Sequence, residues 1–110
     1  MESKWPPQPI FSIYATHPEL EERIDAFVVQ MGERVDLLQD LESEGNLERL
    51  RERSEAFAAE SRELGYEPLA QVARLVAAAC VEQNPQAARK SLSDLTELCQ
   101  RVRRGHRSSA

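Results

Sequence analysis

Apolar residues recur at steps of three and four over most of the chain, which is the spacing of one face of an α-helix. Thr16 and Glu19 have the spacing of a capping box, and Pro18 lies where a first helical turn tolerates it, so the pattern predicts a helix that begins at Thr16. Gly32 allows this helix to bend without ending it. The apolar stripe consists of Leu20, Ile24, Phe27, Val28, Met31, Val35, Leu38 and Leu41.

A second helix is predicted from Leu47 to about Leu64, because end signals flank it. Gly45 suits the left-handed position after a helix, and Asn46 suits the N-cap of the next one. Two of the inward positions are serine, which indicates either that another helix approaches closely or that the hydroxyls bond back to the preceding turn. The inward positions are Leu47, Leu50, Ser54, Phe57, Ser61 and Leu64.

Gly65 and Tyr66 end this pattern, and Glu67 with Pro68 predicts the start of a third helix. Its inward positions are Leu69, Val72, Ala73, Val76 and Cys80.

Asn84 as the N-cap, followed by Pro85 in the first turn, predicts the start of a fourth helix. We expect this helix to stop at Gly105. Four amphipathic helices with short loops predict an all-α fold, an antiparallel up-and-down four-helix bundle over residues 17–104. Residues 105–110 are predicted to form a flexible basic tail. The inward positions of the fourth helix are Ala88, Leu92, Leu95, Leu98, Cys99 and Val102.

The first part of the chain, residues 1–16, has a different composition, with three of the six prolines of the sequence. Proline-rich segments of this kind favour extended backbone over helix. We therefore expect an extended arm whose apolar side chains pack on the bundle. These side chains are Trp5, Ile10, Phe11, Ile13 and Tyr14.

A chain of 110 residues with 41% hydrophobic and 30% charged residues is typical of one soluble domain with its own core. The net charge of −5 argues against nucleic acid as a partner, since phosphate binding needs a surplus of cations. No stretch has the length of a membrane span or the form of a signal peptide, so a cytoplasmic protein is expected.

Cys80 and Cys99 fall on apolar helical faces without metal-ligand spacing around them, so both are interpreted as small buried hydrophobes. Carboxylates are numerous but lie on the polar flank of the first helix, where solvated charges are usual. No nucleophile or glycine-rich phosphate loop accompanies them. The sequence therefore predicts no enzyme activity, no small-molecule substrate, no cofactor and no metal.

Two stretches, PIFSIYATHPEL and SEAFAAESRELGYEPL, carry a resemblance to a known family. With the long helix between them, the chain from about residue 9 to about residue 102 resembles the histidine-containing phosphotransfer (HPt) domains of bacterial two-component phosphorelays. Members of that family often open with a Pro-Ile-Tyr-Ser arm. Their second bundle helix carries a motif of the form His-x-Leu-Lys-Gly-Ser/Ala-Ala-x-x-Leu/Tyr-Gly.

When the final glycine of this motif is placed on Gly65, the phosphoacceptor position falls on Glu55. Phe57 takes the apolar position, Ala58 replaces the family's lysine, and Ala59 replaces its glycine. A relay acceptor needs an exposed nucleophilic imidazole. The resemblance therefore implies a histidine-less domain with no catalytic residue, which keeps the fold and the partner surface of the family.

That surface would bind a response-regulator receiver domain or a histidine kinase through the exposed faces of the first two helices. The helical spacing turns Glu55 away from the apolar stripe and toward solvent. Glu55 is then either an ordinary surface glutamate paired with Arg51 or a charge that orients a partner. The predicted contact residues are Arg51, Glu55, Ala58, Ala59 and Arg62.

Two other functions remain open at this point. His17, next to Pro18, and His106, in the basic tail, are the two histidines of the chain, and either could make it an active phosphorelay carrier. Alternatively, Trp5 and the arm could make it a helical scaffold or dimerisation module.

Overall fold

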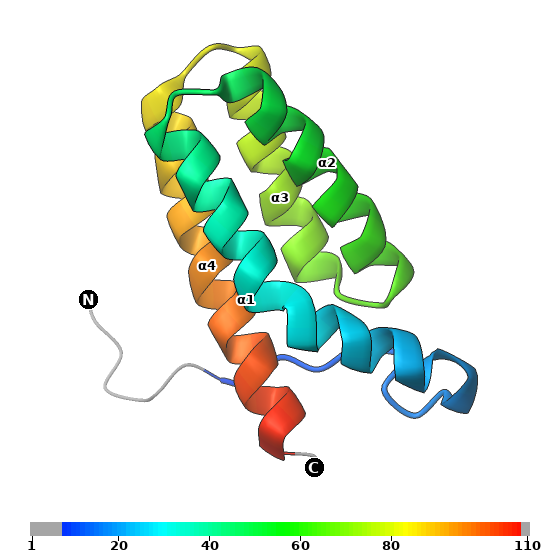
Figure 1. Cartoon of the computed structure of the whole chain (residues 1–110). Helices are drawn as coiled ribbons and strands as arrows, with labels where there is room; N and C mark the ends of the chain where they lie inside the picture. Colours follow the sequence, from blue (N-terminus) through cyan, green and yellow to red (C-terminus); the bar gives the residue numbers. More distant parts are fainter. Residues whose placement is uncertain (1–7, 109–110) are drawn as a thin grey trace.

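The computed structural model describes residues 8–108, and over this range the chain is all-helical, with no strand (Figure 1). A short 3₁₀-helix, η1, is followed by four α-helices that form a compact globule. No helix in this range is long and apolar enough to cross a membrane. The elements are η1 (Pro18–Leu20), α1 (Glu21–Ser43), α2 (Leu47–Glu63), α3 (Glu67–Val81) and α4 (Pro85–Ser108).

The turns between the helices use the residues that the sequence indicates. Gly45 and Gly65 have φ values of 73° and 86°, which glycine adopts without a steric penalty. The Asn46 side chain accepts a hydrogen bond of 3.2 Å from the Arg49 N–H, and Asn84 caps α4 in the same way. In Figure 1 the α1–α2 and α3–α4 turns lie at one end of the molecule and the α2–α3 turn at the other.

The predicted apolar stripes meet in one core. The Phe27 ring contacts two aromatic neighbours, with its centroid 5.4 Å from that of Phe57 and 5.8 Å from that of Tyr66. Tyr66 belongs to the turn before α3, so the second contact joins α1 to the α2–α3 turn.

Ser54 and Ser61 of α2 are fully buried. Neither hydroxyl has a hydrogen-bond partner within the described part of the chain, so they do not bond back to the preceding turn. Of all helix pairs, α2 and α3 pack against each other most extensively. Small buried side chains in both helices permit this close packing. In α2 they include Ser54 and Ser61, and in α3 they include Ala70, Ala73 and Ala77.

The predicted start of the first helix is wrong by several residues. Two successive turns precede it, in which the Ala15 N–H donates to the Ser12 carbonyl and the His17 N–H donates to the Tyr14 carbonyl. Thr16 is held in these turns, and the 3₁₀-helix after His17 has no side-chain cap. Regular α-helix begins only at Glu21.

The predicted helix end at Gly105 is also wrong, because α4 continues to Ser108. Gly105 is buried, and a Cβ atom there would lie 2.9 Å from the Ile10 carbonyl oxygen of the arm. The arm is held at this point by the Ile10 N–H, which donates to the Arg101 carbonyl at 3.1 Å. Glycine at position 105 lets the backbone of the arm lie close to α4. Residues 105–108 are thus helix and not tail, and residues 109–110 lie outside the described range.

The described part of the arm crosses from α4 to the α2–α3 turn. The Ile13 N–H donates to the Gly65 carbonyl, and the Ser12 hydroxyl donates to the Leu64 carbonyl at 2.5 Å. Ile10 and Tyr14 pack against the core, as expected, but Phe11 and Ile13 are 53% and 73% exposed. In extended backbone, alternate side chains point to opposite sides. For this reason only some of the apolar side chains of the arm pack against the core. Trp5 lies outside the described residues.

Candidate functional site

Glu55, at the position that the resemblance assigns to the phosphoacceptor, lies on the exposed side of α2. Its side chain is 52% exposed, and the Arg51 Nη1 atom lies 3.0 Å from its Oε1 atom. This is the pair that the helical spacing predicts. Exposed pairs of this kind contribute about 0.3–0.5 kcal/mol, so either side chain is able to exchange its partner for a group on another protein.

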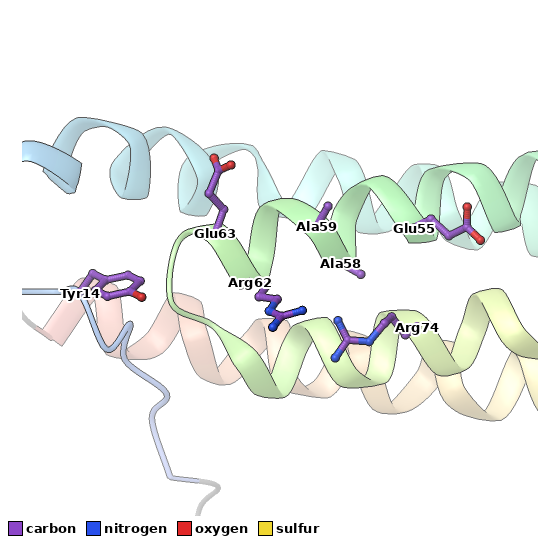
Figure 2. Close-up of a pocket in the computed structure, with 7 residues that line it drawn as sticks. All are labelled: Tyr14, Glu55, Ala58, Ala59, Arg62, Glu63 and Arg74. Carbon is purple, nitrogen blue, oxygen red and sulfur yellow. The ribbon is translucent and has the colours of Figure 1, made fainter.

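A shallow groove of about 570 Å³ brings together four of the five residues predicted for the partner surface. Figure 2 shows the groove running along α2 and α3, with Glu55 toward one end and Tyr14 of the arm at the other. Arg51 adjoins the groove through its pair with Glu55. The groove is lined by Tyr14, Glu55, Ala58, Ala59, Arg62, Glu63 and Arg74.

The groove and the predicted surface differ in their walls. The groove lies between α2 and α3, because its second wall carries Arg74 of α3, whereas a contact through the exposed faces of the first two helices stays a prediction. Ala58 is also only 3% exposed, since α3 covers that side of α2, so it forms the floor of the groove and not an outer contact. Ala59 is exposed, as the prediction requires.

The charges of the groove are arranged as two groups of ion pairs. The Arg62 and Arg74 side chains point toward each other in Figure 2, and both lie near one carboxylate, that of Glu67. The Arg74 Nη2 atom is 3.1 Å from this carboxylate and the Arg62 Nε atom is 3.9 Å from it. Two guanidinium groups thus share one carboxylate, which leaves a net positive charge beside the α3 wall.

Glu63 points away from the two arginines in Figure 2 and forms an ion pair with Arg23 of α1. Its charge is therefore turned toward α1. Glu55 lies toward one end of the groove, and Arg62 and Arg74 lie between Glu55 and Tyr14 (Figure 2), so charges of both signs line the groove.

Three of the lining residues, Tyr14, Glu63 and Arg74, are absent from the predicted surface. Tyr14 reaches the groove because the Ser12–Leu64 hydrogen bond fixes the arm beside the α2–α3 turn. Arg74 reaches it through the close packing of α2 on α3. The local sequence around Tyr14 and Arg74 does not indicate that either residue lines the groove. The spacing of Glu67 and Arg74, seven residues apart, is compatible with their ion pair, which spans two helical turns.

Neither histidine lines the groove. His17 precedes η1 in an extended conformation, as expected, and its ring packs edge-on against Tyr14 at 5.3 Å. His106 lies in α4, not in a flexible tail, and its Nε2 atom is 3.2 Å from the Asp25 Oδ1 atom of α1.

Both cysteines are buried and free, in agreement with their reading as small hydrophobes. Burial raises the pKa of both thiols, that of Cys99 to about 12. The thiolate is the reactive form, so these cysteines stay unreactive in the folded protein at neutral pH.

The geometry around Glu55 suits docking of another macromolecule, because small residues form an open groove and charges of both signs lie along it. Glutamate carboxylates and arginine guanidinium groups at the surface give a partner orientation more than affinity. Comparisons of the chain with models of protein families, with curated proteins and with solved structures found no match.

Proposed function

We propose that this chain is a histidine-less HPt-like domain that binds a receiver domain or a histidine kinase of a bacterial two-component system without relaying phosphate. The observation that carries the proposal is the groove, which gathers four of the five surface residues implied by the resemblance. The finer topology is part of the proposal: an antiparallel up-and-down bundle of the HPt type, in a cytoplasmic protein that is not an enzyme.

The two alanines of α2 support docking at this surface. Ala58 and Ala59 stand where the family has a lysine and a glycine, and neither side chain extends beyond Cβ. Ala59 is exposed and Ala58 forms the floor of the groove, so no long side chain of α2 blocks a partner at these two positions. Small residues at the centre of a contact, with charges around them, fit the usual anatomy of a transient interface.

Glu55 supports binding without transfer. Phosphorelay uses an imidazole that forms a phosphoramidate, whereas a carboxylate forms an acyl phosphate, so Glu55 is no chemical substitute for histidine. Its exposed carboxylate, held by Arg51, instead places a negative charge at the position where the family carries its phosphoryl group. We infer that this charge orients the partner.

The test is to incubate the purified chain with a phosphorylated receiver domain, or with an active hybrid kinase, and to measure phosphate transfer and binding together. We expect binding without transfer. Glu55→Arg reverses the charge in the groove and is expected to weaken binding about tenfold, which is about 1.4 kcal/mol. Glu52→Arg is the matched control, because Glu52 is exposed on α2 but does not line the groove.

A second pair of variants tests the shape of the groove. Ala59→Trp fills the groove without changing its charge and should abolish binding, whereas Ala56→Trp places the same ring on α2 outside the groove and should not. Transfer of phosphate that is lost in His17→Ala or His106→Ala would instead identify a relay carrier. A stable dimer, with no binding of receiver or kinase, would identify a scaffold.

A further inference from the structure

The outward face of α3 is apolar over the second half of the helix. From Leu75 to Val81 the chain reads LVAAACV, with no charged, hydroxyl or amide side chain. A helix that is apolar all round is normally buried, because surface helices place polar residues on the side that faces water. α3 packs against α2 and α4, yet Leu75 and Val81 are 58% and 65% exposed. This half of α3 thus has an apolar face that nothing covers in the described part of the chain.

The exposed residues of this face centre on Ala78. At about 100° per residue, every exposed position from 71 to 82 lies within about 60° of Ala78 around the helix axis. The side chain of Ala78 is small, so another helix can approach the middle of the face closely. We call this set the α3 stripe, and it consists of Gln71, Arg74, Leu75, Ala78, Val81 and Glu82.

We propose that a second copy of the chain covers the α3 stripe, with two antiparallel α3 helices packed across a twofold axis at Ala78. In such a pair, a residue before Ala78 in one copy lies at the same height as the residue equally far after Ala78 in the other. Leu75 and Val81 are equally far from Ala78, so they meet across the axis. Arg74 and Glu82 are also equally far from it. The stripe is therefore complementary to itself, apolar residue to apolar residue and cation to carboxylate.

The two charges of the stripe are available for this contact. Glu82 is exposed and forms no ion pair with a side chain that the structure describes. Arg74 pairs with Glu67 of its own helix, with 3.1 Å between the Arg74 Nη2 and Glu67 Oε2 atoms. A guanidinium group has five N–H donors, so Arg74 can keep this pair and bind a second carboxylate. The twofold axis would form the Arg74–Glu82 pair twice.

The contact is small, which predicts a weak dimer. A single pair of helices offers less area than the roughly 1,200–2,000 Å² that a stable interface buries. We therefore expect a dissociation constant on the order of 0.1 mM. The arm takes no part in this contact, unlike the scaffold considered above. Arg74 also lines the groove around Glu55, but the chain alone forms the dimer, so its test is separate from that of the proposed function.

Sedimentation equilibrium of the full chain between about 10 µM and 1 mM measures the dimer. We expect the average mass to rise with concentration toward that of two chains. Leu75→Gln should weaken the dimer at least about fivefold, because it removes an apolar contact twice. Val29→Gln, the matched control, changes an exposed aliphatic side chain of α1 and should alter the affinity less than about twofold. A monomer at about 1 mM, or equal effects of the two variants, would overturn the proposal.

Charge exchange tests the pairing of the two helices. Arg74→Glu puts two carboxylates opposite each other and Glu82→Arg puts two guanidinium groups opposite each other, so each variant alone should dimerise about tenfold more weakly. An equimolar mixture of the two variants should dimerise again, because each copy then supplies the charge that the other lacks. A mixture that associates no better than the single variants would show that Arg74 and Glu82 do not meet, and would overturn the antiparallel pairing.

A cysteine on the stripe locates the axis. Ala78→Cys brings two thiols together in the dimer, and oxidised glutathione should link them by a disulfide. Gln71→Cys is the matched control, because its two copies would lie about 20 Å apart along the helices. The native cysteines are buried and do not compete. Equal cross-linking of the two variants would contradict an axis at Ala78.

Discussion

Gly105 and Gly32 are two glycines inside helices that have opposite roles. A Cβ atom at Gly105 would lie 2.9 Å from the Ile10 carbonyl oxygen, which is backbone and is fixed by the hydrogen bond of Ile10 to Arg101. A Cβ atom at Gly32 would meet only the end of the flexible Arg103 side chain, at 3.4 Å. The first glycine is required by tertiary contact, and the second is not.

We therefore expect Gly105→Ala to destabilise the protein and Gly32→Ala to leave its stability equal or higher. Alanine gains about 1 kcal/mol of helix propensity at either position, but at Gly105 the arm must move away to make room. Urea denaturation measures the difference. A Gly105→Ala variant as stable as Gly32→Ala would show that the arm does not pack closely on α4.

The buried hydroxyls of Ser54 and Ser61 have no hydrogen-bond partner among residues 8–108, whereas the Ser12 hydroxyl has two. Ser12 donates to the Leu64 carbonyl and accepts from the Tyr14 N–H. At the scale of the element, Ser54 and Ser61 contribute small side chains to helix packing, whereas Ser12 contributes hydrogen bonds that hold the arm.

Ser54→Ala and Ser61→Ala are expected to raise the free energy of unfolding by up to about 1 kcal/mol each, because a buried hydroxyl without a partner is removed. Ser12→Ala should lower it by about 1–2 kcal/mol, since the Leu64 carbonyl loses its donor. Chemical denaturation of the three variants is the measurement. A marked loss of stability in Ser54→Ala would indicate a hydrogen bond of its hydroxyl in solution.

The helix ends at the turns between the four α-helices were predictable because local signals mark them, whereas the start of α1 and the end of α4 were not predicted correctly. Asn46 and Asn84 cap the helices that they were expected to cap, and Gly45 has the left-handed conformation expected of it. Gly105 looked like a similar end signal, but its reason is the Ile10 backbone at the other end of the chain. A tertiary contact of this kind leaves no periodic pattern in the sequence.

The candidate site was predictable only along α2. The helical spacing correctly put Glu55 at the surface, since exposure follows from the position of one stripe on one helix. It could not reveal that α3 covers Ala58 or that Arg74 faces Arg62, because both depend on how two helices meet. The walls of a groove between two helices depend on how the helices pack. The apolar pattern of each single helix does not contain this information.

At the scale of the whole molecule, the buried thiols predict how stability depends on alkaline pH. Burial raises the pKa of Cys99 from 9.0 to about 12, so above pH 9 the unfolded chain releases a proton that the folded chain still holds. The contribution of the neutral Cys99 thiol to the free energy of unfolding is complete below pH 9. It falls by roughly 1 kcal/mol per pH unit as the pH rises toward 12.

Cys99→Ala is expected to be less stable at neutral pH, because a buried group is removed, but to lose less stability between pH 9 and pH 11. Thermal melts of both proteins across this range give the comparison. Tyr66, whose pKa is also raised by burial, adds to the alkaline loss in both proteins alike. Parallel pH profiles for the two proteins would contradict the assignment to Cys99.

The arm has a consequence for the order in which the chain folds. Each helix hairpin closes over a short turn, whereas the arm is fastened to the Gly65 carbonyl at one point and to the Arg101 carbonyl at another. The arm can reach both attachment points at once only after the α2–α3 turn and α4 have come together, and closing such long loops costs more chain entropy. Arm docking is thus expected as the last folding step and its release as the first step of opening, so the Ile10 and Ile13 amides should exchange their hydrogens before those of the helices they touch.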